Sequence, residues 1–231
     1  MLGLAKPVAA SGTLRVLGAL LSYPDAQMRQ HLPEMREILR RESVLSETRL
    51  TEIEELIASL SAADQLEVEA DYVELFDRGR GTSLHLFEHV HGDSRDRGPA
   101  MIDLAQTYEK AGLYLALGEL PDYLPAVLEF VSTQPPREAI AFLSEMAHIF
   151  TSIFSALCER RSPYASVLGA LLELAGEKAQ AVALAAEPSL DEAWVEPPVF
   201  DGCSTKGQAK PCQPQPVRIV RKHNSAQGAS S

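Results

Sequence analysis

Cysteine is scarce in this sequence, and the few that occur cannot form a disulfide framework. The three cysteines are Cys158, in a helical pattern, and Cys203 and Cys212 near the C-terminus. No C-x-x-C pair is present, and the cysteines and His223 are too widely spaced for an ordinary zinc motif. An odd and sparse set of cysteines indicates a reducing compartment.

Long uncharged runs are also missing. The longest stretch without Asp, Glu, Lys or Arg is Met146–Cys158, whose 13 residues are fewer than the roughly 18–20 that span a bilayer. Near the N-terminus, Arg15 interrupts the apolar run Leu14–Leu21, so no secretory leader is predicted. We therefore expect a cytoplasmic protein without integral membrane association.

Basic residues are too few to balance the acidic ones. The formal net charge is −11, and the residues from 201 onward carry +4, which leaves −15 on residues 1–200. Such an acidic body argues against nucleic acid and anionic membranes as partners. It favours a cationic partner, whose encounter with the protein the charge would accelerate.

Motifs for phosphate binding and serine hydrolysis are absent. The glycine-rich stretch at residues 79–83 lacks the G-x-x-x-x-G-K-[ST] spacing, and no strand is predicted before it. No serine lies in a G-x-S-x-G elbow. The sequence therefore contains no recognisable site for phosphate binding or for serine hydrolysis.

Helical periodicity dominates what is present. Apolar residues recur every three or four positions over most of the chain, and the strongest stripe runs from Leu143 to Leu157. No convincing run of strands is found. The sequence predicts an all-α protein with a single helical bundle domain over residues 10–190. Residues 191–231 are rich in proline and polar residues, which predicts a disordered tail.

Several residues mark helix starts and breaks. Asp25 is predicted to cap a helix that Pro33 breaks or restarts. Ser61 and Asp64 resemble a capping box that opens another helix. The glycine-rich, charged segment Asp77–Gly98 is not helical by pattern, and its length predicts a functional or partly helical loop.

One pattern in that loop points to metal chemistry. His85, Glu88 and His89 fit the H-x-x-E-H motif of zinc peptidases, in which both histidines ligate zinc and the glutamate is the base. The motif is short, and a glycine-rich loop and Gly92 leave little helix to hold it rigid. A structural or binding role for the histidines is favoured, and a zinc-dependent hydrolase remains the alternative.

Two further groups flank this loop. Tyr72 and Phe76 end a predicted helix, and as helical neighbours they favour core packing over a place in a groove. Glu119 and Asp122 lie in a break between two helices. Asp122 could cap the following helix, and both carboxylates could face a cationic ligand.

Together these segments resemble a known family. Residues 72–98, YVELFDRGRGTSLHLFEHVHGDSRDRG, resemble the signature stretch of respiratory nitrate reductase assembly chaperones of the NarJ type. Residues 119–123 resemble the E-P-x-D-H hinge of the broader class of chaperones for molybdoenzymes with twin-arginine-type leaders. The pattern has proline directly after the glutamate, whereas this sequence has Leu120 followed by Pro121. Tyr123 stands in place of the histidine of the pattern. Both departures fit the nitrate reductase branch. Residues 194–200 also resemble this branch, and the likeness covers roughly residues 10–200.

The resemblance implies a chaperone rather than an enzyme. It implies binding to the N-terminal segment of the nitrate reductase catalytic subunit, which is held until its molybdenum cofactor and iron–sulfur cluster are inserted. The chaperone would bind no cofactor or metal stably and would not remain in the final membrane-attached enzyme. Contact with proteins of molybdenum cofactor biosynthesis is left open.

An acidic helical bundle with an apolar groove can accept a basic amphipathic helix. We expect the residues of this peptide-binding site in three groups, a groove wall, a polar rim and an adjoining loop. The groups are Tyr72, Leu75 and Phe76 for the wall, Glu119, Asp122 and Tyr123 for the rim, and His85, His89 and His91 for the loop.

Overall fold

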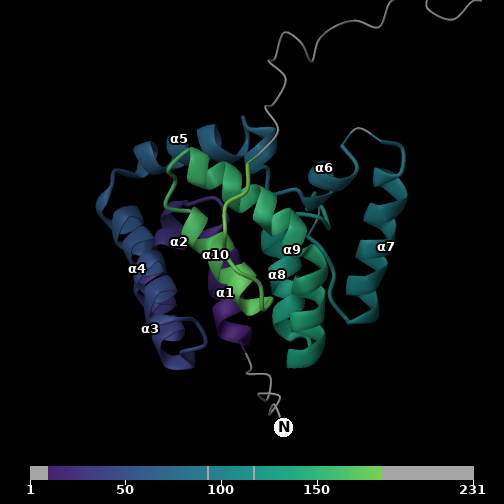
Figure 1. The fold of residues 1–231 in the computed structure, drawn as a ribbon, viewed down its shortest axis with the longest axis horizontal. Coiled ribbons are helices and arrows are strands. Elements are labelled where there is room, and N and C mark those ends of the chain that lie inside the picture. Colours follow the sequence, from purple (N-terminus) through teal and green to yellow (C-terminus); the bar gives the residue numbers. More distant parts are fainter. Residues whose placement is uncertain (1–9, 93, 117, 184–231) are drawn as a thin grey trace, which may run out of the picture. The chain divides into compact units, whose positions relative to one another are not determined.

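The computed structural model describes residues 10–92, 94–116 and 118–183. Within these ranges the chain forms ten α-helices and one 3-10 helix, and no strand (Figure 1). The all-α prediction is therefore confirmed. The helices are Ser11–Leu20 (α1), Ala26–Gln30 (α2), Leu32–Glu42 (α3), Glu47–Ala62 (α4), Gln65–Phe76 (α5), Arg80–Thr82 (η1), Leu86–Val90 (α6), Arg97–Lys110 (α7), Leu124–Thr133 (α8), Pro136–Glu159 (α9) and Ala165–Leu174 (α10).

Local capping chemistry sets several helix starts. The Asp25 carboxylate accepts a hydrogen bond from the Met28 N–H at 2.7 Å, which starts α2 as predicted. Pro33 lies in the first turn of α3, where a missing N–H costs nothing. The expected restart of the helix at this proline is confirmed.

The predicted capping box at Ser61 is wrong. Helix α4 continues through Ala62, and the Ser61 hydroxyl donates back to the Ile57 carbonyl at 2.8 Å within that helix. Asp64 alone caps α5, because its carboxylate accepts from the Leu66 N–H at 2.9 Å. The break between the two helices therefore lies at residues 63 and 64, later in the chain than the sequence pattern suggested.

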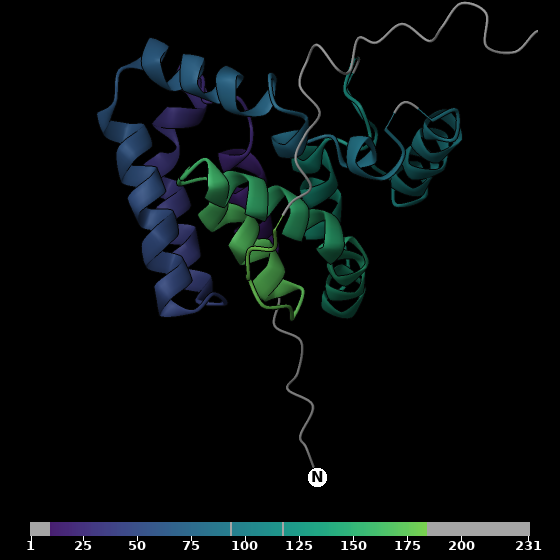
Figure 2. The ribbon, with the colours of Figure 1, turned by 45° about the horizontal axis from the view of Figure 1, so that its top comes forward.

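Helix α9, with 24 residues, is the longest helix in the described ranges, and it lies beside α10 (Figure 2). Its inner face buries Leu143, Phe150, Ile153 and Leu157, which are at most 1% exposed. Helix α10 packs along it, and α1 packs against α8 and α3. Burial of this apolar surface is the main driving force for assembling the helices.

By length and composition alone, α9 is apolar enough to cross a membrane. The core helix of a soluble bundle meets the same criteria, and half of the α9 window is buried against its neighbours. The sequence predicted no membrane-spanning helix because its longest uncharged run has only 13 residues. In the structure, α9 packs against its neighbours as a core helix.

The segment Asp77–Gly98 is partly helical, as expected, and contains η1 and α6. All the described helices lie in one compact unit, Met1–Glu187. The C-terminal boundary of the predicted domain at residue 190 stays a prediction. The predicted tail, residues 191–231, lies outside the described residues.

Candidate functional site

The two segments singled out in the sequence meet in the structure. His85 and Tyr123 form an isolated antiparallel bridge. The Leu86 N–H donates to the Asp122 carbonyl at 3.0 Å, and the Leu124 N–H donates to the Leu84 carbonyl at 2.9 Å. The histidine loop therefore lies directly beside residues 122–124.

Asp122 is the buried centre of this junction. Its side chain is fully buried, and its Oδ2 accepts a hydrogen bond from the Phe87 N–H at 3.2 Å. Its Oδ1 lies 3.3 Å from His85 Nδ1, and Arg97 Nη2 lies 3.7 Å from Oδ2. These groups compensate a buried carboxylate that would otherwise be very costly.

Two expectations for Asp122 are corrected by this geometry. A fully buried carboxylate cannot form the exposed rim of a groove. Nor does Asp122 cap the following helix, because Tyr123 is the N-cap residue of α8. Asp122 instead satisfies the first N–H groups of α6, a helix that precedes it by more than thirty residues.

The pKa of the His85 side chain is shifted by the groups of this junction. The hydrogen bond with Asp122 raises the pKa of the His85 imidazole above its ordinary value, and partial burial opposes that rise. The Glu88 carboxylate adds to the increase and the Arg97 guanidinium reduces it. The protonated imidazole is thus favoured in the folded protein.

This shift predicts a pH-dependent stability. Because the folded pKa of His85 is raised, its contribution is fully present below the unfolded pKa of about 6.5 and is lost as the pH rises through the folded value. We expect the free energy of unfolding to fall as the pH rises above about 6.5, and to fall less in His85→Gln. Urea unfolding at several pH values measures both slopes. His148→Gln, an exposed control on α9, should keep the wild-type slope, and an unchanged slope in His85→Gln would contradict the assignment.

The other two histidines make separate contacts. His89 Nε2 lies 2.9 Å from the Ser83 carbonyl oxygen. The ring of His91 packs edge-on against Phe87, with ring centroids 5.4 Å apart. Both side chains are half-buried and belong to the surface of the junction.

The geometry does not favour the zinc hydrolase alternative. His85 Nδ1 faces Asp122, His89 Nε2 faces a backbone carbonyl, and Glu88 Oε1 lies 3.4 Å from Arg97 Nη2. In the described ranges no three or more His, Cys, Asp and Glu side chains are grouped so that they could hold a metal ion. A catalytic zinc site needs three such ligands and an open position.

Tyr72 and Phe76 are core residues, as the favoured interpretation predicted. They are 4% and 5% exposed, and their ring centroids lie 4.8 Å apart. The Tyr72 hydroxyl donates to the Leu21 carbonyl at 2.7 Å and lies 3.2 Å from the Tyr123 hydroxyl. Their expected place in a groove wall is therefore wrong, because neither ring is accessible.

The remaining predicted residues line two different hollows. Leu75 lines a hollow of about 520 Å³ beside α4. Glu119 and Tyr123 line another of about 340 Å³ between α1 and α8. The predicted residues therefore do not surround one groove. The sequence analysis also missed Arg97 and Tyr164, which carried no motif of their own.

The profile of the nitrate reductase delta subunit family matches residues 26–170, which include all the predicted site residues. The chain belongs to the nitrate reductase delta subunit family. This confirms the resemblance seen in the sequence.

Named relatives of this family member agree. The nitrate reductase molybdenum cofactor assembly chaperone NarJ of Escherichia coli (strain K12) is 44% identical over 162 residues, which are 70% of this chain and 69% of the relative. A Bacillus subtilis protein described as a probable chaperone of the same name is 32% identical over 161 residues, 69% of this chain and 86% of the relative. These names are those of assembly chaperones, so the expectation that this delta subunit family member is not an enzyme is confirmed.

A solved structure shares the fold of this family member. An Archaeoglobus fulgidus protein proposed to be a redox enzyme maturation protein matches with a TM-score of 0.55. The match covers 77% of this chain and 100% of the other, at 20% sequence identity. At that identity the likeness supports the helical fold alone.

Proposed function

We propose that this protein is an assembly chaperone of respiratory nitrate reductase, which holds the catalytic subunit while the molybdenum cofactor is inserted. The observation that carries the proposal is the 44% identity to a chaperone named for this task, over a stretch that includes the junction around Asp122. The chaperone acts in the cytoplasm and leaves before the enzyme is complete. It keeps no cofactor of its own, and proteins that make the cofactor are candidate further partners.

The proposed contact is with the N-terminal segment of the catalytic subunit. The acidic body, at −15 over residues 1–200, favours a basic amphipathic helix and would speed its association. Holding that segment would keep the catalytic subunit competent for insertion of the molybdenum cofactor and the iron–sulfur cluster. Apolar anchors would supply most of the affinity, as in other helix-in-groove complexes.

In this proposal the predicted site residues have two roles, which differ with their burial. The exposed or half-buried ones can touch the client; these are Leu75, His85, His89, His91, Glu119 and Tyr123. Tyr72, Phe76 and Asp122 are buried and hold the surface in place. The buried set acts through the fold, so its variants must be tested for stability before binding.

A binding experiment tests the proposal. Calorimetry with a synthetic peptide of the catalytic subunit's N-terminal segment should show one-to-one binding that weakens with salt. A scrambled peptide of equal composition and charge is the control. Co-purification of the intact catalytic subunit from cells that make both proteins tests the chaperone role itself. Absence of the subunit from the purified complex would contradict the proposed function.

A further inference from the structure

A hollow of about 520 Å³ lies beside α5, between α4 and the turn that joins α9 to α10. We call it the α5 hollow. Its lining is mainly apolar, from Leu56, Leu60, Ala63, Val68 and Leu75, together with Tyr164. Leu56, Leu60, Val68 and Tyr164 are at most 7% exposed and form the buried part of the lining, whereas Ala63 and Leu75 are half-buried. An apolar hollow of this kind fits a side chain of a partner.

Tyr164 gives the α5 hollow an unsatisfied hydrogen-bonding group. The residue is only 6% exposed, and its hydroxyl has no hydrogen-bond partner among the described residues. Tyr72 and Tyr108, which are equally buried, donate to backbone carbonyls at 2.7 and 2.8 Å. A buried hydroxyl without a partner is unfavourable and uncommon, so the exception needs an explanation.

The position of the hydroxyl is fixed by the aromatic cluster of the core. The ring of Tyr164 packs edge-on against Phe76, with centroids 5.1 Å apart, and against Tyr72 at 6.3 Å. Burial raises the pKa of Tyr164, and the Asp71 carboxylate adds to that rise. Tyr164 and Asp71 both line the α5 hollow, and the Tyr164 hydroxyl is shielded from solvent there.

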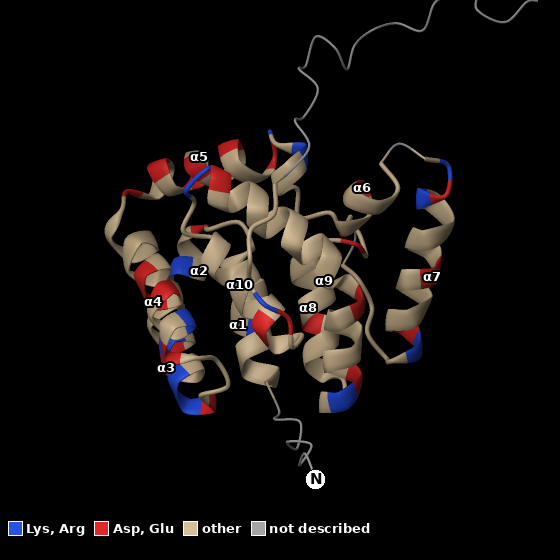
Figure 3. Cartoon of the chain, viewed as in Figure 1, with Lys and Arg blue, Asp and Glu red and all other residues tan. Residues whose placement is uncertain are grey.

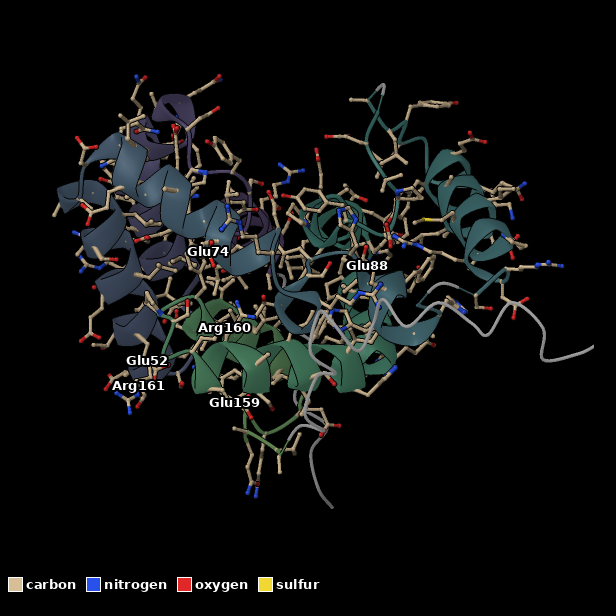
Figure 4. All side chains as sticks on the ribbon, turned by 90° about the horizontal axis from the view of Figure 1, so that it is seen from above. Glu52, Glu74, Glu88, Glu159, Arg160 and Arg161 are labelled. Carbon is tan, nitrogen blue, oxygen red and sulfur yellow. The ribbon has the colours of Figure 1, made fainter. Side chains whose placement is uncertain are left out.

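Charges of opposite sign border the α5 hollow. Asp71 and Glu74 of α5 lie on one side, and Arg160 and Arg161 at the end of α9 lie on the other. Figure 4 shows Glu74 and the two arginines coming from these separate elements, and Figure 3 shows the acidic residues along α5. An apolar centre with a charged border is the usual anatomy of a protein–protein contact.

This border matches the two ends of a helix. The last carbonyl groups of a helix have no partner within it and carry partial negative charge. They suit the arginine side of the hollow and can accept a hydrogen bond from a tyrosine hydroxyl. Basic side chains of the same helix suit Asp71 and Glu74.

We propose that the α5 hollow receives an apolar side chain from the last turn of the client's N-terminal helix, and that the Tyr164 hydroxyl donates a hydrogen bond to a free carbonyl of that turn. This inference rests on the proposed function and names the surface that performs it. Half-buried Leu75 gives way as the carbonyl approaches the hydroxyl. Tyr164 is then an anchor residue whose hydrogen bond forms only in the complex.

Tyr164→Phe is the sharpest test. Because the hydroxyl has no partner in the free protein, its removal should leave the free energy of unfolding unchanged or higher. The dissociation constant of the synthetic client peptide should rise roughly threefold to tenfold, as expected for one lost hydrogen bond. Tyr108→Phe is the matched control. It removes a satisfied hydroxyl, so it should lower the stability and leave the affinity unchanged.

A second pair of variants tests the apolar part of the α5 hollow. Leu75→Ala should weaken peptide binding about tenfold if Leu75 contacts the anchor side chain. Val73→Ala is the control, since Val73 is also half-buried on α5 but lines a different hollow beside Tyr23. Its affinity should match the wild type.

The outcomes separate this inference from the proposed function. If the wild type binds the peptide and Tyr164→Phe and Leu75→Ala bind it equally well, the α5 hollow is not the site and the proposed function stands. If the catalytic subunit co-purifies but the peptide does not bind, the N-terminal contact and this inference both fail. Should Leu75→Ala unfold, Tyr164→Phe still decides the matter.

Discussion

Asp122→Ala is expected to lower the free energy of unfolding by about 2–4 kcal/mol, because it removes a fully buried carboxylate with several partners. The Phe87 N–H loses its acceptor, and His85 and Arg97 lose their common counter-charge. Helix α6 should then detach from residues 122–124. Urea unfolding followed by circular dichroism measures the loss.

Two variants show which property of Asp122 matters. Asp122→Asn keeps an oxygen that can accept from the Phe87 N–H but loses the charge, so its loss of stability should be intermediate. Asp103→Ala removes an exposed carboxylate on α7 and should change the stability by less than about 0.5 kcal/mol. If Asp122→Ala were as stable as Asp103→Ala, the junction would not depend on the buried carboxylate.

Local features of the sequence predicted the helices well. The Asp25 cap, Pro33 and the stripe from Leu143 to Leu157 each act over one or two turns of the chain. The misplaced cap at Ser61 shows the limit of this approach. A serine can start a helix or bond back within one, and only the continuation of α4 through Ala62 distinguishes the two.

The candidate site was less predictable because its contacts are not local. His85 and Asp122 are far apart in the sequence, and only their pairing across the bridge buries the carboxylate. In the sequence, an Asp after a Pro between two helices reads as an exposed cap. Tyr164 belongs to no sequence motif. What distinguishes it is a buried hydroxyl without a hydrogen-bond partner among the described residues, and a sequence pattern does not reveal such a feature.

The aromatic residues illustrate both outcomes. Periodicity placed Tyr72 and Phe76 on one face of a helix, and that face proved to be the core side of α5. Leu75 has the same apolar character but lies one position away, at the edge of the α5 hollow. All three residues are apolar or aromatic, so residue type alone does not show which of them are buried. The orientation of α5 about its own axis buries Tyr72 and Phe76 and leaves Leu75 half-buried.

Phe76→Ala tests this assignment with a large expected effect. Phe76 is 5% exposed and its ring contacts those of Tyr72 and Tyr164, so truncation leaves a cavity in the aromatic cluster. We expect a loss of about 3–5 kcal/mol in the free energy of unfolding, measured by urea unfolding. Leu66→Ala is the matched control on the same helix. Leu66 is 75% exposed, so its truncation should cost less than about 0.5 kcal/mol.

The same variant separates core packing from direct contact with the client. If Phe76 acts only through the core, Phe76→Ala protein that is still folded at low temperature should bind the client peptide nearly as well as the wild type. Phe76→Leu should recover part of the stability, because it refills part of the cavity. Unchanged stability together with lost peptide binding would instead place Phe76 on the binding surface. The burial of its ring beside Tyr164 argues for the first result.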